Sequence, residues 1–523
     1  MKLAAPKKIA TIRIIDEVSS IVSGLRINDV QALVKDYALF AKNHFFDPRF
    51  KMEKWDGKIR FFTEGGKTYV QLLPDIIKSL KNWGYKIVLK DDRFPFVLDD
   101  IKIDKDYFKD YGWELGSHQE RALNAILAHH NGIIRVGTGG GKTLITAVLC
   151  DAYVKKGYPI IVIVPSEDLV IQTAAEIGQF SFSVGVYYGK KKETDKDVIV
   201  STWQSLNTNR HILSLFGGII VDECHGANTS TQLAGLLGKE GRNHPIRIGL
   251  TGTLPDYHTD KLTVLCHLGP VRAIVKSSEL IEAGWLSDLN LVMFEFKEDF
   301  KNDYAEYLDS LPDEHENKNI TYIQFKNKVL FPNFDSEKKY LHSNNDRYEV
   351  IASAIQQISE QHGNSFILVN TVATAKKLTK MLGDNTIFIS SKIKNRSEIY
   401  DAFKTSTGLK AVVTFSLAST GLNVPRIFNL ITVDQSKAFI RVVQTIGRGL
   451  RKAEDKNVVN VFDFYSDVKY AKKHSTQRKK IFKKESYPYR VCKLDYTSPD
   501  CVETINKEAN KFHKERLKNE AFK

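Results

Sequence analysis

The segment IIRVGTGGGKT, residues 133–143, decides the fold of this chain. A short β-branched strand that breaks into glycines and ends in Gly-Lys-Thr predicts a phosphate-binding loop between a strand and a helix. Glycines let backbone N–H groups approach phosphate oxygens, and the N-terminus of the following helix attracts the same charge. We therefore expect Gly139, Gly140, Gly141 and Lys142 to bind phosphates and the Thr143 hydroxyl to hold Mg²⁺.

One position departs from the usual form of this loop. The common pattern has a glycine five residues before Gly141, and this chain has Val136 there. For the loop taken alone, a glycine-rich turn in another kind of α/β protein is therefore the alternative interpretation.

Composition and charge limit the class of protein. The chain has 523 residues, 42% hydrophobic and 26% charged, as expected for a soluble globular protein of about three domains. Its net charge of +14 favours a polyanionic partner, nucleic acid first and a membrane surface second. Five cysteines without paired ligand spacing argue against structural zinc and a disulfide framework. Lacking a transmembrane run and a signal-peptide core, the chain is expected to be intracellular.

Two stretches alternate between apolar strands and helical patterns, which predicts an α/β fold with parallel sheets. Strands are expected at 133–136, 160–164, 198–201, 219–221 and 246–250, and again at 366–369, 387–390, 411–414, 430–433 and 458–463. We divide the chain into a small mixed α/β accessory domain at 1–100, a first parallel-sheet domain at 101–290, an insertion or linker at 291–345, a second parallel-sheet domain at 346–465 and a basic extension at 466–523.

An acidic pair follows the apolar strand at 219–221. We expect Asp222 to hold Mg²⁺ through its water shell and Glu223 to orient or deprotonate an attacking water. Asp-Glu pairs are common on surfaces, but this one follows a phosphate loop and ends an apolar strand. Zinc ligation by Cys224 and His225 is excluded because no partner ligands lie at suitable spacing, and His225 is expected to hydrogen-bond across the site.

A third motif, QTIGRGLR at 444–451, places Arg448 and Arg451 three positions apart. If the segment is helical, both arginines lie on one face and can bind phosphate oxygens. Such cations stabilise the charge of a phosphoryl-transfer transition state. The alternative is a surface helix with solvated arginines.

Basic and aromatic residues alternate between Phe46 and Phe62. We expect a strand hairpin around an Asp56-Gly57 turn that presents cations to phosphates and rings to bases. Its candidate nucleic-acid contacts are Arg49, Trp55, Lys58 and Arg60. The alternative is a hairpin whose aromatic residues are core and whose charges are solvated.

The order of these motifs resembles that of superfamily 2 helicases, over residues 115 to 455. In that family a glutamine like Gln119 reads adenine, and a small apolar residue such as Val136 is common in the phosphate loop. The DECH run at 222–225 resembles motif II, TGT at 251–253 motif III, and QTIGRGLR motif VI. The resemblance implies two tandem RecA-like parallel-sheet domains that close on ATP and Mg²⁺.

The resemblance also implies roles for further residues. VPS at 164–166 is similar to motif Ia, STWQS at 201–205 to the next strand-contact motif, residues 366–370 to motif IV, and TGLNVP at 420–425 to motif V. It implies nucleic-acid contacts from Ser166, Thr202, Gln204, Asn370 and Thr420, nucleotide contacts from Gly421 and Asn423, and transition-state arginines at Arg448 and Arg451. Many members of the family have Asp where this chain has Asn423.

A narrower resemblance is to the UvsW-type phage helicases of recombination and repair. It rests on DPRF at 47–50, WDGKIR at 55–60, TWQ at 202–204 and the QTIGR run. It implies ATP-dependent remodelling of branched DNA, namely Holliday-junction migration, fork regression and unwinding of D-loops and R-loops. It also implies a DNA-binding N-terminal domain, a monomer acting in the host cytoplasm, and single-strand-binding or recombination proteins as partners.

Three other classes compete with this hypothesis. A double-strand DNA translocase of the restriction type shares the motor motifs, although no nuclease pattern is evident. An RNA-unwinding DExD/H helicase would have a similar motor. A non-catalytic scaffold is disfavoured by intact Lys142, Glu223 and Arg451.

Overall fold

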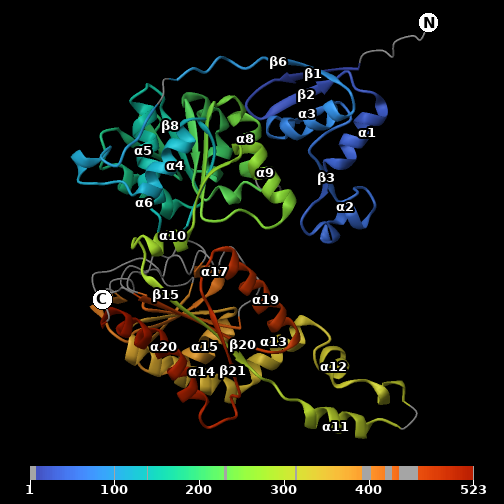
Figure 1. Cartoon of the computed structure of the whole chain (residues 1–523), viewed down its shortest axis with the longest axis vertical. Helices are drawn as coiled ribbons and strands as arrows, with labels where there is room; N and C mark the ends of the chain where they lie inside the picture. Colours follow the sequence, from blue (N-terminus) through green and yellow to red (C-terminus); the bar gives the residue numbers. More distant parts are fainter. Residues whose placement is uncertain are drawn as a thin grey trace. The chain divides into compact units, whose positions relative to one another are not determined.

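The computed structural model describes residues 8–98, 101–137, 139–228, 232–312, 315–390, 402–403, 405–418, 427–434 and 458–521. The chain divides into two compact units, Met1–Lys276 and Ser277–Lys523 (Figure 1). The expected α/β class is confirmed, because each unit contains a parallel sheet with helices and the first also carries a small mixed sheet. Within the described ranges, no helix combines the length and apolarity needed to cross a membrane.

The N-terminal part of the first unit is a four-stranded mixed sheet in the order β5-β2-β1-β6. The strands are β1 (Ile9–Ile14), β2 (Ser19–Ser23), β5 (Lys67–Tyr69) and β6 (Lys86–Asp91). β1 pairs antiparallel with β2 and parallel with β6. Two amphipathic helices, α1 (Ile27–Asp36) and α3 (Leu73–Asn82), bury Leu33 and Ile76 in one core with Ile12 of β1.

The expected hairpin around Asp56-Gly57 is wrong in its first strand. β4 (Lys58–Arg60) does follow the turn, but it pairs antiparallel with β3 (Ala38–Phe40). The residues between are helical, in η1 (His44–Phe46) and α2 (Pro48–Lys51). The reason is local: Pro48 occupies the first helical position, and the Asp47 carboxylate caps the helix by accepting from Arg49 N at 2.8 Å.

The main sheet of the first unit has eight strands in the order β10-β9-β11-β8-β12-β13-β7-β14. They are β7 (Asn131–Val136), β8 (Ile160–Val164), β9 (Val184–Tyr188), β10 (Lys191–Lys192), β11 (Val198–Thr202), β12 (Gly218–Val221), β13 (Ile246–Thr251) and β14 (Val271–Val275). Every neighbouring pair is parallel except β9 and β10. The central strands β8, β11, β12 and β13 are wholly buried, which explains their continuous apolar runs.

The helices of the first unit connect these strands. They are α4 (Ser117–Leu127), α5 (Lys142–Val154), α6 (Glu167–Ile177), α7 (Trp203–Thr208), α8 (Gln232–Gly238) and α9 (His258–Leu268). Helix α9 also meets the N-terminal part, because Thr259 Oγ1 donates to Phe40 O at 2.7 Å and Cys266 belongs to that core. The N-terminal sheet and the main sheet are thus packed through α9.

The second unit is built on a seven-stranded sheet, all parallel, in the order β17-β18-β16-β19-β20-β15-β21. Its strands are β15 (Asp288–Phe296), β16 (Ser365–Val369), β17 (Thr386–Ile389), β18 (Lys410–Thr414), β19 (Asn429–Val433), β20 (Val458–Ser466) and β21 (Arg490–Leu494). Its longer helices are α14 (Asn345–His362), α15 (Val372–Leu382), α19 (Lys469–Lys484) and α20 (Cys501–Ala521).

The boundaries of the second unit differ from those expected at 290/291 and 465/466. Strand β15 crosses the first position and pairs with β20 and β21. The expected basic extension supplies β21 and α20, and Asn290 Nδ2 of β15 donates to Ala509 O of α20 at 3.0 Å. Long-range pairing therefore brings the two flanking segments into the same sheet.

The segment 297–345 has a small core of its own. It contains α11 (Lys301–Ser310), η7 (Glu316–Asn319), α12 (Tyr322–Gln324), the π-helix η8 (Phe325–Leu330) and α13 (Phe334–Ser343). The buried side chains of Phe300, Phe325 and Phe331 cluster with Val468 and Ala471 of the α19 region. This insertion is therefore anchored on α19.

Ile220 tests the packing that supports the acidic pair. Its side chain lies wholly buried in β12, so we expect Ile220→Ala to leave a cavity and lower the free energy of unfolding of the first unit by about 2–5 kcal/mol. Ile171→Ala is the control, because that side chain is 55% exposed on α6. Urea denaturation measures the free energy of unfolding of both variants, and hydrogen exchange reports the stability of β12 in each. Equal effects of the two substitutions would contradict this account of the core.

Candidate nucleotide-binding site and nucleic-acid contacts

The glycine-rich segment forms a loop between β7 and α5, and helix α5 begins at Lys142. Gly139 and Gly141 have φ of 85° and 78°, the left-handed region that favours glycine. A Cβ on Gly141 would lie 2.1 Å from Gln119 Nε2, so a side chain at this position would displace the Gln119 amide. Gln119 Nε2 donates to Gly140 O at 3.4 Å, and its Oε1 accepts from Gly116 N at 3.0 Å. The predicted adenine-reading glutamine therefore contacts the predicted phosphate loop.

The acidic pair ends β12 and faces the same loop. Lys142 Nζ lies 2.5 Å from Glu223 Oε1, which joins residues 81 positions apart in the chain. Glu223 adopts φ 48° and ψ 45°, an uncommon conformation for a residue with a side chain, and its N–H donates to Asp222 Oδ1 at 2.9 Å. This turn separates the two carboxylates that strand β12 delivers to one edge.

Motif II and motif III are joined through a histidine. His225 Nδ1 lies 3.2 Å from Glu223 Oε2 and 3.0 Å from Thr251 Oγ1. Thr251 Oγ1 in turn donates to Thr253 O at 2.8 Å. The hydrogen bond that the sequence analysis expected from His225 is present, and it runs from the end of β12 to the end of β13.

The electrostatics differ for the two acids. Burial disfavours the charged form of Glu223, but Lys142 and His225 outweigh burial and hold the pKa of this carboxyl well below its usual range. For Asp222, burial prevails over the attraction of Lys142 and raises the pKa above its ordinary value. Glu223 is thus the ionised partner of Lys142 in the protein alone.

The donor set suits Mg²⁺ held jointly with phosphate oxygens. Thr143 lies in the first turn of α5, and Asp222 lies at the end of β12. Among the described residues no group of three or more His, Cys, Asp or Glu could hold a metal by itself. A site with one hydroxyl and one carboxylate fits Mg²⁺, which keeps several waters and usually completes its shell with substrate phosphates.

Two of the residues predicted to contact nucleic acid in the first unit are helix caps. Ser166 Oγ accepts from Leu169 N at 3.4 Å at the start of α6, and Thr202 Oγ1 accepts from Ser205 N at 3.2 Å at the start of α7. They follow the neighbouring parallel strands β8 and β11, so both helix N-termini lie at one edge of the sheet. Thr202 is 3% exposed whereas Gln204 is exposed, so the Gln204 amide is the side chain there that a ligand can reach.

In the second unit, Asn370 follows β16 and its Nδ2 donates to the backbone carbonyl of Asp434, at the end of β19. The residue after it, Thr371, caps α15. The remaining predicted residues of this unit, Thr420, Gly421, Asn423, Arg448 and Arg451, lie outside the described residues.

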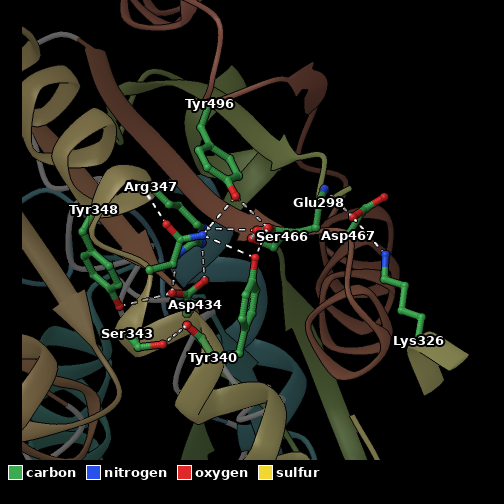
Figure 2. Close-up of polar contacts among 11 residues, drawn as sticks. Glu298, Lys326, Tyr340, Ser343, Arg347, Tyr348, Asp434, Ser466, Asp467 and Tyr496 are labelled. Carbon is green, nitrogen blue, oxygen red and sulfur yellow. Dashed lines mark hydrogen bonds and ion pairs between the residues drawn. The ribbon is translucent and has the colours of Figure 1, made fainter. Parts of the chain in front are cut away.

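Sequence reasoning missed a buried polar network around Arg347 and Asp434 (Figure 2). The fully buried Arg347 binds both carboxylate oxygens of Asp434, at 2.8 and 2.5 Å. Burial opposes the charge of Arg347, but Asp434 outweighs it and raises the pKa of the guanidinium. Glu298 accepts from Tyr340 at 2.6 Å and Tyr496 at 3.0 Å, and lies 3.9 Å from Arg347 Nε. Arg347 gave no signal in the sequence because it sits in an ordinary amphipathic helix.

The predicted N-terminal contacts are largely paired with one another. Arg49 lies over the Trp55 ring at 5.0 Å from its centroid, and its guanidinium contacts Asp47 at 2.8 Å. Trp55 Nε1 donates to Lys58 O at 2.9 Å, and Arg60 forms an ion pair with Asp56 at 2.7 Å.

Two strongly exposed aromatic rings of the N-terminal part lie in η1. Phe45 is 65% exposed and Phe46 is 76% exposed, and the Phe45 ring contacts those of His44 and Phe50. Composition alone could not identify them, because exposure depends on the short helix that follows.

Gly141 tests the close approach of loop and helix. Gly141→Ala should lower nucleotide affinity at least roughly tenfold, because an alanine is strained at a φ of 78° and its Cβ would displace the Gln119 amide from the loop. The matched control is Gly157→Ala, since Gly157 has φ of 82° but open space at its Cβ position. Equilibrium binding of a fluorescent ATP analogue is the measurement. A similar loss of affinity in both variants would mean that general backbone strain, and not displacement of Gln119 at the loop, lowers nucleotide binding.

Comparisons with known proteins agree with this arrangement. Three family models match in chain order: "DNA helicase UvsW, N-terminal" at residues 22–90, "Type III restriction enzyme, res subunit" at 112–256 and "Helicase conserved C-terminal domain" at 346–453. The first model covers α1, α3, β5 and most of β6 but not β1, and the other two fall on the two parallel-sheet regions.

Curated relatives match over most of their length. The ATP-dependent DNA helicase uvsW of Enterobacteria phage T4 is 24% identical over 478 residues, covering 86% of this chain and 89% of that protein. Putative helicase 22 of Sulfolobus islandicus filamentous virus is 24% identical over 503 residues, covering 86% and 84%. The solved structure of the type ISP restriction-modification enzyme LlaBIII bound to DNA shares the fold, with a TM-score of 0.51, 15% identity, and coverage of 79% of this chain and 34% of that one.

The phosphate loop, the Lys142–Glu223 pair and the His225–Thr251 bond thus lie within residues 112–256, between a UvsW N-terminal match at 22–90 and a helicase C-terminal match at 346–453. The chain belongs to superfamily 2 of the helicases and is a UvsW-like, ATP-hydrolysing DNA helicase.

Proposed function

We propose that this helicase uses ATP hydrolysis to remodel branched DNA, by migrating Holliday junctions, regressing forks and unwinding D-loops and R-loops. The observation that carries the proposal is the combination of an ATPase site with an N-terminal sheet of the UvsW type in one chain. The segment between β3 and β4 of that N-terminal part carries cations and exposed rings, the pairing of groups that suits DNA backbones and unstacked bases. Action on a branch point requires a contact besides the motor, and this region supplies a candidate.

We assign the chemical roles from the geometry of the first unit. Gly139, Gly140, Gly141 and Lys142 bind the phosphates of ATP, and Gln119 contacts the adenine. Thr143 and Asp222 hold Mg²⁺, which neutralises charge on the phosphates when bound. Lys142 must leave Glu223 to reach a phosphate, and the released carboxylate can then accept a proton from the attacking water.

Further roles rest on the motifs alone. We propose Arg448 and Arg451 as the cations that stabilise transition-state charge, and Gly421 and Asn423 as nucleotide contacts. We propose that DNA phosphates are bound near Ser166, Gln204, Asn370 and Thr420, with the Thr202 turn offering backbone amides because its hydroxyl is used in capping. Such contacts hold a strand without reading its sequence, so affinity should fall steeply with salt.

Two finer proposals follow from the resemblance to phage relatives. The protein acts as a monomer in the host cytoplasm, and single-strand-binding or recombination proteins are its protein partners. The runner-up function is double-strand DNA translocation without unwinding, which the match of residues 112–256 to a restriction-enzyme motor favours.

The ATPase assignment is tested at the ion pair. Lys142→Ala and Glu223→Gln should each lower DNA-stimulated ATP turnover by at least about a hundredfold, because one removes a phosphate-binding cation and the other a catalytic base. Steady-state phosphate release with saturating single-stranded DNA measures this, and DNA binding by each variant should survive. Lys155→Ala, at the opposite end of α5, is the control. Full turnover in Lys142→Ala or Glu223→Gln would exclude the assigned roles.

The branched-DNA proposal is tested on four substrates side by side: a Holliday junction, a fork, a linear duplex and an RNA duplex. We expect ATP-driven unwinding of the first two to exceed that of the linear and RNA duplexes. Trp55→Ala should reduce unwinding of branched substrates more than single-strand-stimulated ATP turnover, because it removes the ring that supports Arg49. Trp113→Ala is the control, a tryptophan 45% exposed outside the N-terminal sheet.

Equal unwinding of all four substrates would refute the preference for branches. Translocation on linear duplex without strand separation would support the runner-up instead. Parallel losses of unwinding and ATP turnover in Trp55→Ala would show that this ring serves stability and not DNA.

A further inference from the structure

The second unit contains a cavity that the motor motifs do not account for. It has a volume of about 330 Å³ and lies between α13 of the insertion, the first turn of α15, the end of β19 and the start of α19. This volume is within the usual range for sites of small organic groups. Each of these elements belongs to the second unit, so the cavity is complete within it.

Aromatic rings form much of the cavity wall. Phe334 is 40% exposed, and its ring centroid lies 5.6 Å from that of His474 at an interplanar angle of 63°. His342 and Tyr348 line the opposite part, with centroids 6.5 Å apart. Flat rings of this kind bind other flat aromatic groups by stacking and edge contacts.

The recessed carboxylates of the wall are already bound by the protein. Asp434 is held by Arg347, and the Glu337 oxygens accept from Tyr470 N and Ala471 N at 2.7 Å each. Burial, together with nearby Lys377 and Lys338, lowers the pKa of His342 and so favours its uncharged imidazole. The interior therefore favours an uncharged aromatic group over a cation.

The surroundings of the cavity are basic. Helix α19 carries lysines and no acidic residue from 469 to 484, and its exposed lysines are Lys469, Lys472, Lys473, Lys480, Lys483 and Lys484. The buried Arg478 of the same helix is bound to Asp463 of β20 at 2.7 Å, which fixes the helix on the sheet. Helix α13 adds the exposed Lys338 and Lys339 together with one exposed carboxylate, Asp335, so lysines outnumber acids at this rim. A surface of this charge attracts a polyanion.

The cavity also adjoins the expected path of DNA, because Asn370, Thr371 and Ala373 line it. We propose that this cavity takes one unpaired base of the bound DNA strand, while the neighbouring phosphates of that strand lie along the lysines of α13 and α19. The ligand is thus a nucleobase on a polyanionic backbone, bound without sequence preference because every base has an aromatic face. This inference rests on the proposed function, since it requires that DNA crosses motif IV.

The test uses a substitution that fills the cavity and compares the binding of DNA that has bases with the binding of DNA that lacks them. Ala373→Trp places an indole in the cavity, and Val372→Trp is the matched control, because Val372 precedes it in the same turn, is 52% exposed and does not line the cavity. The probes are oligodeoxythymidylate and an abasic phosphodiester oligomer of equal length. Ala373→Trp should weaken oligodeoxythymidylate binding by roughly five- to a hundredfold and leave abasic binding at the wild-type value.

Two results would overturn the base site. One is a preference for oligodeoxythymidylate over the abasic oligomer that is the same in Ala373→Trp, Val372→Trp and the wild type. The other is an equal loss on both probes, which would mean that only the backbone passes here. Melting temperatures report whether each variant is folded, and Phe334→Ala, which removes a wall at the surface, gives the same readout if Ala373→Trp does not fold.

The phosphate path is tested by charge reversal. Lys472→Glu with Lys473→Glu should reduce the magnitude of the log–log salt slope of single-strand binding by about 0.7 for each phosphate that these lysines no longer neutralise. Lys507→Glu with Lys511→Glu is the control, because these exposed lysines belong to α20, which does not line the cavity. An unchanged slope in the α19 variant would refute the path.

Failure of this inference is distinguishable from failure of the proposed function. Wild-type protein that unwinds no branched substrate refutes the proposed function whatever these variants bind. Wild-type protein that unwinds normally, with base preference intact in Ala373→Trp, refutes the base site alone.

Discussion

The arrangement of the first unit depends on one ion pair, between Lys142 at the start of α5 and Glu223 at the end of β12. The two strands that carry these residues are not neighbours, because β13 lies between them. Only a parallel sheet in this order brings the phosphate loop, the acidic pair and the Thr251 turn to the same edge. The site therefore requires the whole sheet, and local sequence around either residue could not form it.

Much of the fold could be predicted, because a strand buried on both faces has a continuous apolar run. All ten expected strands of the two parallel sheets are present, within a few residues of their expected ends. The sequence analysis did not predict β9, β10 and β14 of the first sheet, and its other errors concern which strands pair. Strand β15 was assigned to a linker and β21 to an extension, although both join the second sheet. The partner of β4 was also wrong, because the cap formed by Asp47 and Pro48 competes with a strand at that place.

The candidate site, like the fold, could be predicted from the sequence only in part. Residue type and spacing predicted site roles for Gln119, Lys142 and Glu223, and the structure brings these three residues to the same loop. They were not enough to show that the Thr202 hydroxyl is buried as a helix cap, or that Arg347 binds Asp434 in the interior. Burial of a polar group depends on what packs over it from distant segments, and no local pattern records that.

The Arg347–Asp434 pair also limits how this protein can change over evolutionary time. A buried guanidinium that loses its carboxylate is an uncompensated charge, whereas a joint replacement of both partners by apolar residues is often tolerated. Because Glu298 and Tyr340 complete the network from the insertion, these positions should substitute as a group among homologues. The insertion is then inherited together with the strand end that it contacts, and it cannot be exchanged like an independent module.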